Sequence, residues 1–201
     1  MKNINTTPVK TLITLAALLI VNFSFGKTYI AVNSGKWSDA STWQNEAPGN
    51  TISADDEVII KSHITMTTDV AVNGTLTIDK GESVMSNKTL VISNSGKLNN
   101  NGNVAVKRIV NSGTITNNSM MESMNEIENK GAINNNSNMV AGTNLLNFGG
   151  NVAGKQGTYF ANGTVIASTD AKFGNNVKIY ANPSTATSMN EVPANEMLAK
   201  N

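Results

Sequence analysis

The densest group of acidic side chains in this sequence is Asp55, Asp56 and Glu57, with Asp39 and Glu46 upstream. Calcium is bound by several carboxylate oxygens, so a calcium site is the chemistry that this cluster suggests. Its spacing matches no known calcium loop such as the EF-hand, however, and Asp side chains often accept hydrogen bonds from backbone amides in turns. We therefore interpret Asp55 and Asp56 as parts of a polar turn and predict no metal site and no cofactor.

His63 is the sole histidine of the chain, which also contains no cysteine. A histidine can act as a general base or as a metal ligand, but here no second histidine or thiolate is present to share a metal. His63 precedes an apolar residue, Ile64, which we expect to point inward. Alternation then points the histidine outward, and we predict a surface histidine.

Two further patterns suggest chemistry on a polysaccharide. Lys107 and Arg108 are comparable to the basic residue with which some lyases remove a proton beside a calcium-bound uronate, but no acidic residue occurs between Glu82 and Glu122 to hold that calcium. Paired-carboxylate hydrolysis needs two acids across a cleft. Three glutamates could cluster on one face, but nothing in the sequence marks a cleft around them: Glu122, Glu126 and Glu128. We predict no catalytic residue.

The overall composition excludes some partners. Charged residues make up 14% of the 201 residues, and the formal net charge is +1. Such a chain lacks the positive surface that nucleic acid and anionic membranes attract. Without cysteine there is also no disulfide, so packing and backbone hydrogen bonds must stabilise the fold alone.

The N-terminus has the features of an export signal. Lys2 and Lys10 are followed by an apolar run over residues 11–21, which is too short to span a bilayer comfortably. Ser24 and Gly26 are the small residues that a signal peptidase requires, so we expect residues 1–26 to be removed by cleavage after Gly26. The mature chain is then expected to be secreted or held at the cell surface, with no transmembrane segment.

From residue 58 onward, apolar residues recur every six positions, a period that belongs neither to a helix nor to a simple strand. It suits a short strand with two inward side chains followed by a corner. Three such edges make a triangular coil of about 18 residues, and stacked coils form an all-β parallel β-helix, or β-solenoid. The inward positions form several runs: Val58, Ile64, Val70 and Leu76; Ile60, Met66, Val72, Ile78, Val84 and Leu90; Ile92, Leu98, Val104 and Val110; Ile115, Met121, Ile127, Ile133, Met139 and Leu145.

A second repeat supports the same coil length. Gly96, Gly113, Gly131 and Gly149 are separated by 17, 18 and 18 residues, and we expect them at corners that need a positive φ. An asparagine stands two residues before each glycine: Asn94, Asn111, Asn129 and Asn147. Coils about 4.8 Å apart would let these amides hydrogen-bond as a ladder. Two further columns are expected: Asn99, Thr116 and Asn134; and Asn100, Asn117 and Asn135.

The chain therefore divides into four parts. Residues 1–26 are the signal peptide, and residues 27–56 form an N-terminal cap in which Trp37 and Trp43 cover the open end of the solenoid. Residues 57–181 form the parallel β-helix. Residues 182–201 lack the period and are expected to form a flexible tail.

Residues 35–65 carry a motif of G-x-W-x-D-x-x-T-W, a proline, D-D-x-V-x-I and the pair His63-Ile64. This motif resembles the opening of bacterial cell-surface β-helix proteins, including those related to the G8 domain. The segments NSGTITN and NKGAINN are similar to coil repeats of filamentous-haemagglutinin-type adhesins. The resemblance implies a right-handed parallel β-helix on an exported surface protein, without a settled chemistry.

We expect an exported, non-enzymatic solenoid that acts as a surface, matrix or adhesion component. Its partners would be cell-surface glycans or other surface proteins, bound on faces rich in Asn, Ser and Thr; the residues that bind them are not identified by the sequence. The alternative is a small or degenerate carbohydrate-active enzyme of the lyase or hydrolase type.

Overall fold

Short strands with alternating buried and exposed side chains follow one another around three faces, and each strand pairs in parallel with the strand one coil later, except that the final short strand (Asn190–Glu191) is antiparallel to its neighbour. The computed structural model describes residues 26–181 and strand β24 (Asn190–Glu191). Most of the expected signal peptide and of the expected tail lie outside the described residues. The prediction of an all-β triangular parallel β-solenoid is confirmed, with about 7 turns of about 20 residues.

The three faces are called sheets A, B and C. Sheet A contains β1 (Thr28–Ala31), β4 (Glu57–Ile60), β7 (Thr75–Ile78), β10 (Lys97–Asn100), β13 (Thr114–Asn117), β16 (Ala132–Asn135), β19 (Asn151–Ala153) and β22 (Lys172–Phe173). Sheet B contains β2 (Gly35–Lys36), β5 (Ile64–Met66), β8 (Ser83–Ser86), β11 (Asn103–Val106), β14 (Met121–Ser123), β17 (Asn138–Ala141), β20 (Thr158–Ala161), β23 (Lys178–Ala181) and β24. Sheet C contains β3 (Thr51–Ile52), β6 (Val70–Val72), β9 (Thr89–Ile92), β12 (Arg108–Asn111), β15 (Ile127–Asn129), β18 (Leu145–Asn147) and β21 (Val165–Ala167).

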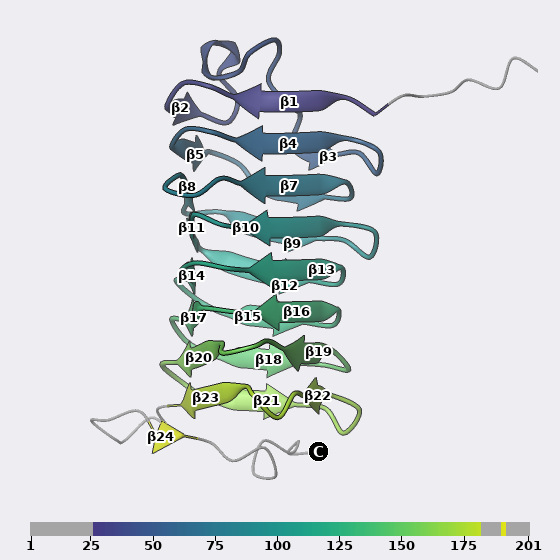
Figure 1. The fold of residues 1–201 in the computed structure, drawn as a ribbon, viewed down its shortest axis with the longest axis vertical. Coiled ribbons are helices and arrows are strands. Elements are labelled where there is room, and N and C mark those ends of the chain that lie inside the picture. Colours follow the sequence, from purple (N-terminus) through teal and green to yellow (C-terminus); the bar gives the residue numbers. More distant parts are fainter. Residues whose placement is uncertain (1–25, 182–189, 192–201) are drawn as a thin grey trace, which may run out of the picture.

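The coil is right-handed. In Figure 1 the strands of sheet A lie in front and run to the left, those of sheet C lie behind and run to the right, and the chain descends from β1 to β23. Coil length varies around the expected 18 residues: the sheet A strands from β4 onward begin at residues 57, 75, 97, 114, 132, 151 and 172. The strands stay in register because corners between them absorb the extra residues.

The core is a column of inward side chains from all three sheets. Nearly all the predicted inward positions up to Leu145 are buried, and Tyr159, Ala161 and Ile179 continue the column into the last coils. The prediction was wrong at Val110, which points outward, whereas its neighbours Ile109 and Asn111 are buried. The reason is that a single residue, Lys107, separates β11 from β12. The repeat is therefore one residue shorter between Val104 and Ile109, and not after Val110.

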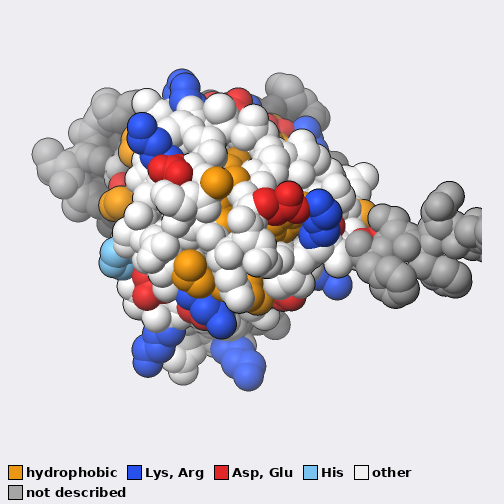
Figure 2. Space-filling view, turned by 90° about the horizontal axis from the view of Figure 1, so that it is seen from above, with side chains coloured by type: hydrophobic (Ala, Val, Ile, Leu, Met, Phe, Trp, Pro, Cys, Tyr) orange, Lys and Arg blue, Asp and Glu red, His pale blue; other side chains and the backbone are white. Residues whose placement is uncertain are grey.

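The N-terminal end is closed by a loop that carries both tryptophans. Trp37 and Trp43 are 1% and 4% exposed, and their rings meet edge to face with centroids 5.2 Å apart. The indole Nε1 of Trp43 donates to the carbonyl of Trp37, and that of Trp37 donates to the carbonyl of Gly49. Seen from this end, hydrophobic side chains form only small separate patches (Figure 2).

The solenoid itself begins within the segment that the sequence assigned to the cap. β1, β2 and β3 pair in parallel with β4, β5 and β6, so residues 28–52 already contribute one strand to each sheet. The covering loop also contains a single turn of 3-10 helix, η1 (Ala40–Thr42). Asp39 caps this turn by accepting from the backbone N–H and the hydroxyl of Ser41, and these bonds lower the pKa of its carboxyl.

Two buried asparagine ladders run along the core. The Nδ2 of Asn111 donates to Oδ1 of Asn129 at 2.8 Å, and Asn129 donates to Asn147 at 2.9 Å, so the predicted ladder is confirmed for these three residues. The expected column of Asn100, Asn117 and Asn135 forms a second ladder, with distances of 2.7 and 2.8 Å.

The ladder prediction was wrong for Asn94. The residue that pairs with Asn111 in the preceding coil is Ile92, and Asn94 lies exposed in the corner that follows. The corner from β9 to β10 contains residues 93–96, whereas the one from β12 to β13 contains only residues 112–113. The residue two positions before Gly96, which is Asn94, therefore lies two residues after the ladder position of this coil, which is Ile92.

Each buried ladder stops where an apolar residue takes its column. Asn100 pairs with Ile78 of the coil before, and its Oδ1 accepts no hydrogen bond from the described residues. Asn147 pairs with Ala167 of the coil after, and its Nδ2 likewise has no acceptor there. A buried amide is therefore favourable here only as a member of a column, since an unpaired buried polar atom costs free energy.

The corner glycines are needed mainly because coils approach closely. A Cβ on Gly96, Gly113 or Gly131 would lie 1.9–2.2 Å from a carbonyl oxygen of the preceding coil, and none of these residues has a positive φ. The expectation of positive φ was therefore wrong for these three. It holds for Gly149 (φ +74°), but the corner column passes through Gly150, the residue directly before β19. The three-residue corner 148–150 causes this shift.

Replacing Asn129 by Ala should lower the free energy of unfolding by about 2–4 kcal/mol, because the buried amides of Asn111 and Asn147 each lose a partner. Urea unfolding followed by circular dichroism measures this. Asn134→Ala, which removes an exposed amide from sheet A, is the control and should change stability little. Equal effects of the two substitutions would contradict the ladder's contribution.

Gly131→Ala should destabilise the solenoid by about 1–3 kcal/mol, because the added methyl would lie 2.2 Å from the carbonyl oxygen of Gly113. Gly174→Ala is a matched control in a late coil, where the nearest atom to the new Cβ lies at 3.5 Å. Thermal unfolding of the two variants compares them. A Gly131→Ala variant as stable as Gly174→Ala would show that the corners can open without cost.

Candidate functional site

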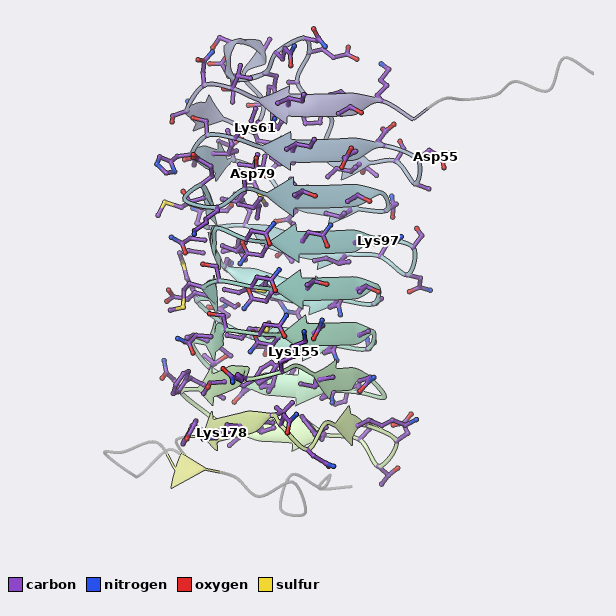
Figure 3. All side chains as sticks on the ribbon, viewed as in Figure 1. Asp55, Lys61, Asp79, Lys97, Lys155 and Lys178 are labelled. Atoms are coloured by element: carbon purple, nitrogen blue, oxygen red, sulfur yellow. The ribbon has the colours of Figure 1, made fainter. Side chains whose placement is uncertain are left out.

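The acidic residues considered for calcium serve the first coil. The carboxyl Oδ1 of Asp56 accepts from the backbone N–H of Lys27 at 2.8 Å, which ties the start of β1 to the corner before β4. Asp55 is exposed at that same corner (Figure 3). Within the residues that the structure describes, no group of three or more acidic, histidine or cysteine side chains could hold a metal ion.

The remaining candidate residues for catalysis are separated by the fold. His63 is exposed, with its Nδ1 3.1 Å from the hydroxyl of Ser83 and 3.4 Å from a carboxylate oxygen of Glu82. Glu122 lies on sheet B, whereas Glu128 lies on strand β15 of sheet C and Glu126 directly precedes that strand, so the three glutamates do not share one face. The reason is that the corner after β14 turns the chain from one face to the next.

Arg108 is held in an ion-pair cluster on sheet C. Its Nη2 lies 2.7 Å from Glu128 and 3.1 Å from Glu126, and Lys130 lies 2.6 Å from the other carboxylate oxygen of Glu128. These pairs compensate the charges of all four side chains. Lys107 stands apart from them in the exposed corner before β12. The cluster thus supplies neither a free base nor a pair of carboxylates across a cleft.

A third asparagine column lies on the outside, at the corner between sheets A and B. The Nδ2 of Asn118 donates to Oδ1 of Asn101 at 2.9 Å, and Asn136 donates to Asn118 at 2.8 Å. We call these three residues the outer ladder. Sequence analysis missed it, although a signal existed: each member directly follows a member of a buried ladder, in the Asn-Asn pairs at 100–101, 117–118 and 135–136.

The outer ladder differs from the buried ladders in its spare hydrogen-bonding capacity. A side-chain amide has two N–H donors and an oxygen with two lone pairs. In the buried ladders the second N–H is bound at Asn100, Asn111 and Asn117, because their Nδ2 atoms also donate to the backbone carbonyls of Met120, Ala132 and Asn138. Asn118 and Asn136 make no such second bond to a described residue, so each presents an N–H and a lone pair to solvent.

A shallow hollow lies at each end of the outer ladder, on the same corner. The upper one is lined by Lys80, Gly81, Asn101, Gly102, Asn103, Asn118 and Ser119. The lower one, of about 560 Å³, is lined by Lys155, Gln156, Thr158, Asn175, Asn176, Val177 and Lys178. The backbone N–H of Lys155 donates to Oδ1 of Asn136 at 3.1 Å, which joins the ladder to the lower hollow. We call the two hollows and the ladder the corner strip.

An aromatic pair borders the lower hollow. Phe160 on β20 and Tyr180 on β23 point outward from sheet B and stack with their ring centroids 5.4 Å apart. Thr158 and Lys178, which line the hollow, lie two residues earlier on the same two strands. Apolar ring surface therefore adjoins the amide, hydroxyl and ammonium groups of the strip.

One further buried group, Tyr159, has no role at this surface. Its side chain lies in the core, its hydroxyl has no hydrogen-bond partner among the described residues, and burial raises the pKa of its phenol.

Across residues 26–181, the chain contains no helix of the length and apolar character needed to cross a membrane. No protein-family model matches the sequence, and neither does any curated protein or any solved structure. What sequence and structure together identify is the architecture, a parallel β-solenoid of about 7 turns with asparagine ladders.

Proposed function

We propose that this protein is an exported, non-enzymatic solenoid that binds a linear glycan along the corner strip. The observation that carries the proposal is the outer ladder, in which the amides of Asn118 and Asn136 each have an N–H donor and an oxygen lone pair that are not bound to a described residue. Sugar hydroxyls both donate and accept, so a row of amides at regular spacing complements them. Export is inferred from the N-terminal signal and from the resemblance to cell-surface β-helix proteins.

The dimensions of the strip suit a polymer better than a small molecule. It extends over six successive coils, from the corner at Lys80 to the one at Lys178, and so spans about 24 Å at the usual strand spacing. Its hollows are shallow, whereas small ligands are usually enclosed. The ladder is fixed by its own hydrogen bonds, so little side-chain entropy is lost on binding.

Replacing Asn118 by Ala should weaken glycan binding about fivefold, since a lost hydrogen bond at an exposed site is worth about 1 kcal/mol. A glycan array probed with residues 27–201 identifies the oligosaccharide, and titration calorimetry measures its affinity. Asn94→Ala, at the corner between sheets C and A, removes an exposed amide outside the strip and should leave the affinity unchanged. An array without binders, or equal loss in both variants, would contradict the proposal.

A second candidate function, self-association, is favoured by the outer face of sheet C. The register places Ala71, Val91, Val110, Leu146 and Ile166 in one outward column, interrupted only by Glu128. Phe148, which follows β18, is 39% exposed beside it. The charges on this face pair with each other, so it would not repel a second copy of itself. We propose a second copy of this chain as its partner.

Sedimentation equilibrium tests this candidate. The wild-type chain should form a dimer at concentrations of about 100 µM, and Leu146→Glu should be monomeric because it places a charge in an apolar contact. Met85→Glu is the control, since Met85 is 54% exposed on sheet B and should not affect the dimer. A monomeric wild-type chain, or a dimer that survives Leu146→Glu, would exclude sheet C as the contact face.

A further inference from the structure

We infer that the lower hollow of the corner strip is an anion site that selects glycans bearing carboxylate or sulfate groups. The inference rests on the proposed glycan binding and adds the chemical class of the ligand. Lys155 and Lys178 both line this hollow, and its lining contains no carboxylate. Neither lysine forms an ion pair with any residue that the structure describes.

Several other basic side chains of the solenoid are compensated by carboxylates. Lys27 is paired with Glu46 at 2.6 Å, which raises the pKa of its ammonium, and Arg108 and Lys130 belong to the cluster on sheet C. In the upper hollow, Lys80 has Asp79 and Glu82 close by in the chain. The strip is thus asymmetric: its centre is neutral, its upper end carries both signs in and beside the lining, and the charged residues that line its lower end are both lysines.

The backbone that presents the two lysines is fixed by the fold. The N–H of Lys155 is bound to Asn136 of the outer ladder, and the N–H of Lys178 donates to the carbonyl of Gly157 at 3.3 Å. Figure 3 shows the two lysines on neighbouring coils near the C-terminal end of the solenoid. Thr158 on β20 lies directly opposite Lys178 on β23 in the register, so its hydroxyl group is also held at this hollow.

Neutral donors surround the two charges. Gln156, Asn175 and Asn176 bring amide groups to the hollow, and Thr158 adds a hydroxyl. A carboxylate or sulfate has several acceptor oxygens, which need both charge and directional N–H or O–H donors. Because the hollow is open to water, each lysine contributes modestly, and the anion must be part of a longer chain that also contacts the outer ladder.

The experiment compares a uronic-acid oligosaccharide with the same oligosaccharide after its carboxyl groups have been reduced to alcohols. Titration calorimetry on residues 27–201 at about 20 mM salt should show the acidic form binding about tenfold more tightly. The preference should disappear in the double variant Lys155→Gln/Lys178→Gln, so that the acidic and the reduced oligosaccharide bind this variant with equal affinity. It should also fall steeply at about 300 mM salt, a measurement that needs no variant.

The control variant Lys97→Gln/Lys107→Gln removes the same net charge from two exposed lysines outside the strip and should keep the preference. Neutral binding without an acidic preference, or a preference that survives Lys155→Gln/Lys178→Gln, would overturn this inference alone. Failure of both oligosaccharides to bind would instead overturn the proposed function. A free uronic acid monosaccharide that binds as tightly as the oligomer would show that the hollow acts without the ladder, contrary to the inference.

Discussion

Every coil of this solenoid must match the coils above and below it at the spacing of paired β-strands, about 4.8 Å. At that distance a side chain contacts its counterparts in the neighbouring coils, so compatibility is required column by column. Apolar columns satisfy the requirement by packing. Buried asparagine satisfies it only through an unbroken row, as between Asn111, Asn129 and Asn147, because each amide supplies what the next requires.

The same constraint explains the glycines. A coil that turns within two residues brings its backbone against the carbonyl groups of the coil before, and at Gly131 no room remains for a Cβ. In the corner 148–150, Gly149 has a positive φ, and the close approach falls on Gly150. The constrained residue is thus the one directly before the sheet A strand, whether the corner is short, as at Gly131, or long, as at Gly96.

Buried and outer ladders use one chemistry for two purposes. In Asn117 the second N–H of the amide is bound to a backbone carbonyl, which stabilises the core. In Asn118, one residue further on, that N–H faces solvent beside the next amide of its row. The surface that we propose for glycan binding thus lies beside the column that supports the fold, and the adjoining corners can vary in charge, as at Lys155, without disturbing the core.

The sequence by itself determined the architecture, since a six-residue apolar period and a glycine repeat of 17–18 residues leave few alternatives to a three-sided coil. It also identified most inward residues and three members of the first ladder. It could not place Asn94 or Val110, because their orientation depends on corner lengths that only strand pairing decides. Tertiary structure alone decided the lower hollow: Lys155 and Lys178 belong to different coils, and their juxtaposition follows from stacking, not from sequence distance.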